Sequence, residues 1–132
     1  MIHSFETRVY YEDTDMAGVV YHANYLKFVE RARSTWVREM GVDQNAMRSG
    51  EGLAFAVVRL EADFVKPAIL DDELRVETGI GEVSPVRIRF DQTVLRAGQV
   101  LFRARVTVVV VDGTGRPRRL SPDLRALLEQ AR

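Results

Sequence analysis

The sequence predicts an α+β fold in which a mostly antiparallel sheet of about five strands packs against one long helix. One segment shows helical spacing of apolar residues, four later segments alternate apolar and polar residues, and only short connections separate those four. The chain has 132 residues, of which 46% are hydrophobic and 29% charged. That length and composition are typical of one globular domain, expected to span residues 1–132.

The first strand is expected from Phe5 to Glu12, and the long helix from about Asn24 to Met40. Apolar residues recur every three or four positions along this helix, which gives it one apolar face. Gly41 is expected to end the helix, because glycine readily adopts the left-handed conformation found there. Residues 42–56 are predicted to form a looser connection that lines or gates a pocket.

Four strands are expected next, and the first of them, Ala56–Phe64, should bury one face because its apolar residues alternate with charged ones. The others are expected at residues 74–80, 86–91 and 100–111. The last strand ends in a run of valines, so this end should be covered on both faces. Ser121-Pro122-Asp123 predicts the start of a short C-terminal helix, with serine as the N-cap and proline at the first helical position.

A homodimer is expected from this arrangement on physical grounds. One long helix covers only one face of the sheet, and an open five-stranded sheet keeps exposed edges that proteins usually cover or pair. Both needs are met when two copies join edge to edge into a larger sheet.

Composition excludes several classes of function. The formal net charge is zero, which argues against a general nucleic-acid binder. No apolar run is long enough to span a membrane, and the N-terminus lacks the pattern of a signal peptide. Because there is no cysteine, thiol nucleophiles and thiolate metal ligands are absent, and a cytoplasmic location is expected. Of the 19 basic residues 17 are arginine, which permits a phosphate-bearing ligand but also fits a genome with GC-rich codons.

The segment most suited to catalysis is residues 10–25, whose sequence is YYEDTDMAGVVYHANY. Asp13 and Asp15 lie just before the expected helix, whose free N–H groups stabilise a negative oxygen. A calcium loop is improbable, because the fifth and twelfth positions counted from Asp13 lack suitable ligands. His3 and His22 are too few for a zinc or iron site, and no Gly-x-Ser-x-Gly turn exists for a serine nucleophile.

Carboxylate chemistry beside a helix start therefore remains. Asp15 has a structural alternative, in which its side chain only closes the turn through an Asx hydrogen bond. Asp13 is expected to be structural and to hold the loop. The side chain of His22 has two open interpretations, a local hydrogen bond near the helix start or an active role in orienting water or substrate.

The same run closely resembles the signature of hotdog-fold thioesterases of the 4-hydroxybenzoyl-CoA thioesterase family, and especially the acyl-CoA thioesterases associated with the Tol–Pal system. The resemblance extends to FVERAR at residues 28–33, FVKPA at 64–68, and the valine-rich final strand with its Asp-Gly turn. It implies a curled antiparallel sheet wrapped round the long helix, with two protomers paired edge to edge. Such dimers also pair again, so a homodimer or homotetramer is expected.

The resemblance further implies hydrolysis of an acyl-CoA, with acyl carrier protein as a possible carrier of the thioester, and no metal or redox cofactor. It assigns the catalytic carboxylate to Asp15, as nucleophile or general base, and the oxyanion donor to the backbone N–H near His22. Arginines at 87 and 89, or at 116, 118 and 119, are candidates for contacts with CoA phosphates, although solvated surface residues are the commoner case. The alternatives are a non-catalytic module that binds acyl-CoA or acyl carrier protein, and a hydratase or dehydratase, whose histidine spacing does not match.

Overall fold

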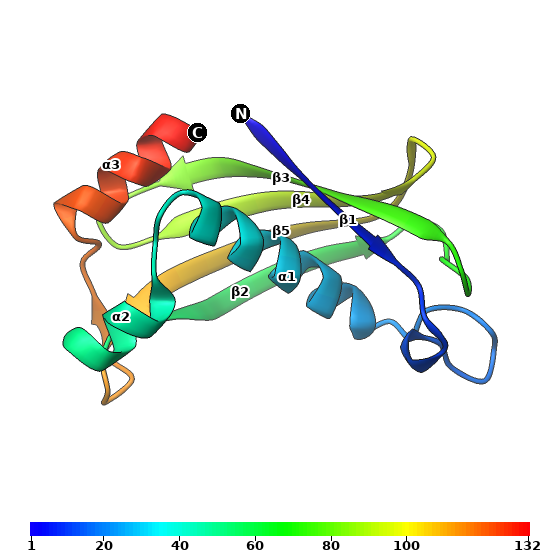
Figure 1. Ribbon diagram of the computed structural model, residues 1–132, viewed down its shortest axis with the longest axis horizontal. Coiled ribbons are helices and arrows are strands. Elements are labelled where there is room, and N and C mark those ends of the chain that lie inside the picture. Colours follow the sequence, from blue (N-terminus) through cyan, green and yellow to red (C-terminus); the bar gives the residue numbers. More distant parts are fainter.

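The computed structural model describes residues 1–132 and shows one antiparallel sheet with helices against it (Figure 1). Its strands are β1 (Ile2–Arg8), β2 (Ala54–Phe64), β3 (Glu73–Val83), β4 (Ile88–Arg96), β5 (Gln99–Val111) and the two-residue β6 (Pro117–Arg118). They are ordered β1-β3-β4-β5-β2, and β6 pairs with β5. The predicted α+β architecture is confirmed, with β2 at one edge and β1 at the other.

The long helix α1 (Asn24–Glu39) lies across one face of the sheet (Figure 1). The hydrophobic core fills the space between them. Its buried apolar residues follow the predicted spacing: Tyr25, Phe28, Val29, Ala32, Trp36 and Val37. Gly41 ends this region with a φ of 99°, as expected of a glycine after a helix. The valine-rich end of β5 is buried on both faces, since Val108, Val109 and Val110 are all at most 4% exposed.

The first strand is shorter than predicted and starts earlier, at Ile2 rather than Phe5. The chain turns at Tyr10, where the carboxylate Oδ2 of Asp13 accepts the backbone N–H of Tyr10 at 2.9 Å. This hydrogen bond closes a short 3-10 helix, η1 (Tyr11–Asp13), which takes up the last two residues of the predicted strand, Tyr11 and Glu12. A local side-chain acceptor thus overrides the β-forming tendency of the two tyrosines.

The prediction that β2 buries one alternating face is wrong for half of the strand. A bulge at Val58 shifts the register between Val57 and Arg59, so the inward face changes from Phe55 and Val57 to Leu60, Ala62 and Phe64. Val58 is 55% exposed and Phe64 also 55% exposed in the single chain. Since β2 pairs only with β5, its outer edge stays open.

Residues 44–50 form a helix, α2 (Gln44–Gly50), and not the loose connection predicted. The side chain of Asp43 caps this helix by accepting the N–H of Ala46 at 3.0 Å. The apolar spacing of the sequence did not indicate α2, because the helix buries no residue. Val86, assigned to a strand, lies in the turn before β4. The C-terminal helix α3 (Pro122–Ala131) has Ser121 as its N-cap, as predicted. None of the helices combines the length and apolar composition needed to cross a membrane.

Candidate active site

Asp13 is buried in the loop between β1 and α1 and forms several of its hydrogen bonds. Its side chain is 8% exposed, and its backbone oxygen accepts the N–H of Tyr21 at 2.9 Å and the side-chain amide of Asn24 at 2.8 Å. Together with the bond to Tyr10, these contacts join the two ends of the loop. The expected structural role of Asp13 fits this geometry.

Asp15 lies in a tight turn on the exposed side of the same loop. Its N–H donates to Val19 O at 3.0 Å, and the N–H of Gly18 donates to Asp15 O at 3.0 Å. Gly18 has a φ of 80°, a conformation that strains residues with a Cβ. The Asx hydrogen bond expected of a structural Asp15 is present, because Asp15 Oδ1 accepts the N–H of Ala17 at 2.9 Å. The other carboxylate oxygen, Oδ2, has no hydrogen-bond partner within the chain.

His22 lies just before Ala23, the N-cap of α1, and is exposed at the end of the same loop. The N–H of Asn24 donates to Tyr21 O at 2.8 Å, whereas the N–H groups of His22 and Ala23 donate to no acceptor within the chain. Unpaired N–H groups at a helix start are suited to an anionic oxygen. The His22 ring makes no side-chain hydrogen bond; it packs against Tyr21 and meets the edge of Phe64 on β2, with ring centroids 6.2 Å apart.

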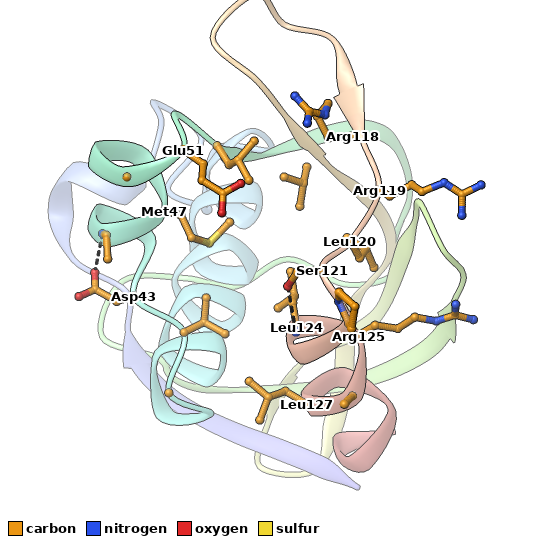
Figure 2. A pocket seen from close by; sticks show the side chains of 18 of the residues that line it. Asp43, Met47, Glu51, Arg118, Arg119, Leu120, Ser121, Leu124, Arg125 and Leu127 are labelled. Atoms are coloured by element: carbon orange, nitrogen blue, oxygen red, sulfur yellow. Dashed lines mark hydrogen bonds between the residues drawn. The ribbon is translucent and has the colours of Figure 1, made fainter.

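The largest cavity, about 1170 Å³, lies at the opposite end of α1 and does not include Asp15 or His22. Its walls come from α2, α3 and the segment of β6 (Figure 2). Leucine, valine and methionine side chains form much of its surface, among them Met47, Leu53 and Leu124. Arg118, Arg119 and Arg125 lie on the side of β6 and α3, and Asp43 and Glu51 lie across from them (Figure 2).

Of the two arginine groups considered from the sequence, only Arg118 and Arg119 line this cavity. The N–H of Leu120 donates to Pro85 O at 2.9 Å, which joins the turn before Arg87 to the segment of Arg118 and Arg119. Both Pro85 and these two arginines line the large cavity. Arg89 is engaged elsewhere, because it pairs with Asp91 at 3.1 Å on the outer face of the sheet.

A smaller cavity of about 150 Å³ lies between α1 and the sheet. Its lining is mostly apolar, with Phe55, Val57 and Phe90 among the side chains. Arg33 forms one polar wall and donates from Nη1 to Gln92 Oε1 at 2.9 Å. Burial lowers the pKa of the Arg33 guanidinium, and the nearby Glu30 acts in the opposite direction.

Comparisons with known proteins identify the family of this chain. A family model described as the thioesterase-like superfamily matches residues 9–128. The acyl-CoA thioesterase YbgC of Haemophilus influenzae is 47% identical over 109 residues, which cover 83% of this chain and 80% of that protein. A probable thioesterase from Bartonella henselae has a TM-score of 0.88 at 40% identity, covering 92% of this chain and all of that one.

The hypothetical protein TT1821 of Thermus thermophilus has a TM-score of 0.91 at 26% identity, covering 100% of this chain and 98% of its own. The predicted hotdog fold is confirmed, because the chain has the expected antiparallel sheet, central helix and short C-terminal helix and superposes on that structure over its whole length. Since the family model spans nearly the whole chain, this protein belongs to the thioesterase-like superfamily, as the run at residues 10–25 indicated.

Proposed function

We propose that this protein is an acyl-CoA thioesterase that hydrolyses a thioester to a free acid and CoA. The observation that carries the proposal is the exposed carboxylate of Asp15 on the loop that ends at the unpaired N–H groups of His22 and Ala23. The relative from Haemophilus influenzae, named an acyl-CoA thioesterase, supports the same activity.

Asp15 acts in this proposal through Oδ2, while Oδ1 holds the turn through Ala17. Either Oδ2 attacks the thioester carbon, giving an anhydride that water then hydrolyses, or it takes a proton from the attacking water. In both routes the carbon–sulfur bond breaks, and CoA leaves as the thiolate. The carbonyl oxygen gains negative charge, which the His22 N–H stabilises by roughly 2.7–4 kcal/mol if it resembles other oxyanion donors.

A second copy of the chain completes the site in this proposal. The open edge of β2 exposes Val57, Val58, Leu60 and Phe64, all at least 37% exposed in the single chain. When β2 pairs antiparallel with its own copy about a two-fold axis, the Phe64 end of one strand lies beside the Ala54 end of the other. Because Phe64 contacts His22, the loop of one copy then faces the cavities that flank the start of β2 in the other.

Two cavities of the second copy have the properties that the halves of an acyl-CoA require. The large cavity offers Arg118 and Arg119 to the phosphates of CoA, since guanidinium groups bind phosphate well. The apolar cavity of about 150 Å³ suits the acyl group, because a cavity of roughly that volume accommodates benzene. Short or single-ring acyl groups are therefore expected to be better substrates than long chains.

The test is free-thiol release from short, long and aromatic acyl-CoAs by the wild type and by Asp15→Asn. Asparagine keeps an oxygen for the Ala17 N–H but is neither a base nor an effective nucleophile. The expected result is turnover by the wild type and a loss of kcat of ~10²-fold or more in the folded variant. Equal turnover by both proteins would refute the role of Asp15.

A non-catalytic module that binds acyl-CoA or acyl carrier protein is the competing function. It predicts saturable binding of acyl-CoA, measured by calorimetry, without thiol release by either protein. Acyl carrier protein loaded with the preferred acyl group, supplied in place of acyl-CoA, distinguishes the two carriers of the thioester.

A further inference from the structure

Tyr25 is the last residue of the run at residues 10–25, and neither proposed chemical role uses it. Its side chain is 3% exposed. The ring stacks on Phe102 with centroids 4.9 Å apart and meets the edge of Phe64 at 5.8 Å, so its orientation is fixed by packing. The phenol oxygen accepts the backbone N–H of Ala68 at 3.0 Å.

Ala68 connects this phenol to the turn that carries Asp15. The backbone oxygen of Ala68 accepts the N–H of Val20 at 2.8 Å, and Val19 forms an antiparallel bridge with Ile69. Val19 O in turn accepts the N–H of Asp15 at 3.0 Å. Three hydrogen bonds, linked by short stretches of backbone, thus connect Tyr25 through Ala68 and the Val19–Val20 segment to the backbone of Asp15, the proposed catalytic residue.

The segment around Ala68 is itself anchored to the sheet. Asp72 Oδ2 accepts the N–H of Ile69 at 2.9 Å and a hydrogen bond from Arg96 Nη1 at 2.7 Å. Arg96 lies at the end of β4, so it joins this segment to a central strand. Ala68 is fully buried, which leaves the Tyr25 oxygen as the acceptor that satisfies its N–H.

We propose that Tyr25 is a positioning residue whose hydroxyl, acting through Ala68 and Val20, fixes Asp15 relative to the N–H of His22. The inference rests on the proposed thioesterase function. Tyr25 also lies only three residues after His22, so the same side chain holds both halves of the site. Small displacements between reacting groups are costly, since misplacement by about 1 Å lowers rates by roughly 10²-fold.

The decisive variant is Tyr25→Phe, which keeps the stacked ring and removes the oxygen. The expected result is a decrease in kcat of about tenfold or more with KM changed less than about twofold, since substrate-binding surfaces stay in place. Hydrogen exchange is expected to accelerate at the amides of Val20 and Ala68 but not at amides in the middle of β4 and β5. Tyr25→His, whose ring nitrogen offers an acceptor, is expected to recover part of the lost kcat.

Thr78→Val is the matched control, because it removes another buried hydroxyl, one that accepts from Gln92 Nε2 at 2.9 Å in the sheet. It is expected to lose a similar amount of stability and to keep kcat, at a temperature where both variants are folded. If both variants lose activity in proportion to stability, the role of Tyr25 is only structural and the proposal is overturned.

Unchanged kcat and unchanged exchange at Val20 and Ala68 in Tyr25→Phe would also overturn it. Absence of thiol release by the wild type has a different meaning, because it contradicts the proposed function itself. In that case the exchange measurement still decides whether the hydroxyl of Tyr25 holds the Asp15 turn.

Discussion

Two aspartates separated by a single residue have opposite environments. Asp13 is buried and accepts the N–H of Tyr10, whereas Asp15 is exposed and keeps one carboxylate oxygen free. Both carboxylates lie close to the helix start, and from the sequence Asp13 was expected to be structural and Asp15 to be the catalytic carboxylate. Burial and hydrogen bonding suit Asp13 to holding the loop and leave Asp15 available for its proposed catalytic role.

This difference predicts separate effects on stability and on activity. Asp13→Ala leaves the N–H of Tyr10 without its acceptor, so it is expected to lower the free energy of unfolding by about 1–3 kcal/mol. Asp15→Asn keeps its turn bond and is expected to change that free energy by about 0.5 kcal/mol or less. Urea unfolding of both variants measures this, and equal losses would show that the two carboxylates are not divided in this way.

The raised pKa of the Tyr25 phenol leads us to expect lower stability at alkaline pH. Burial raises the pKa of its phenol above the ordinary value of 10.0, although the Ala68 N–H and Arg96 act in the opposite direction and Asp72 reinforces the rise. The folded state therefore holds the phenolic proton more tightly than the unfolded state does. Its contribution to stability is complete below about pH 10 and is lost as the pH rises through the raised pKa.

Urea unfolding of the wild type and of Tyr25→Phe at pH 8 and at about pH 10.5 measures this contribution. The free energy of unfolding is expected to fall more steeply with pH in the wild type, because the variant lacks the phenol. Identical slopes in the two proteins would contradict the assignment.

At the scale of the elements, β2 does not lie beside its neighbours in sequence, β1 and β3, but at the opposite edge of the sheet. It pairs only with β5 at the sheet edge, and Val57, Val58 and Phe64 on it are each at least 50% exposed in the single chain. An exposed apolar edge strand is a common site of pairing with another chain. The proposed homodimer uses this edge.

Val58→Lys tests that interface, because a lysine on an edge strand opposes pairing with a second copy. The expected result is a smaller assembly by light scattering, together with loss of most thioesterase activity, since each proposed site needs two copies. Thr93→Lys, on the outer face of β4 away from the edge, is the control and should keep both properties. An active monomer in Val58→Lys would contradict the two-copy site.

At the scale of the whole molecule, α1 separates two regions with different chemistry. Asp15 and His22 lie at its N-terminal end, and the large cavity with its arginines lies at the C-terminal end. A helix of 16 residues spans about 24 Å at roughly 1.5 Å per residue. Assembly through β2 is the proposed way in which the two regions of different copies meet.

The sequence by itself determined the elements that depend on local signals. The helical period of α1, the alternation in β3 and the N-cap at Ser121 each follow from residues that are close together in the sequence. The same holds for the Asp15 turn and the helix start at residues 10–25, whose resemblance to a thioesterase signature also indicated the family.

Only the tertiary structure decided the rest. The bulge in β2, the joining of Pro85 to Leu120 and the bond from Ala68 to Tyr25 depend on contacts that no short sequence pattern specifies. Tyr25 and Ala68 are 43 residues apart in sequence. Their hydrogen bond forms because packing of α1 against the sheet buries both groups, and a buried N–H needs an acceptor wherever the fold supplies one.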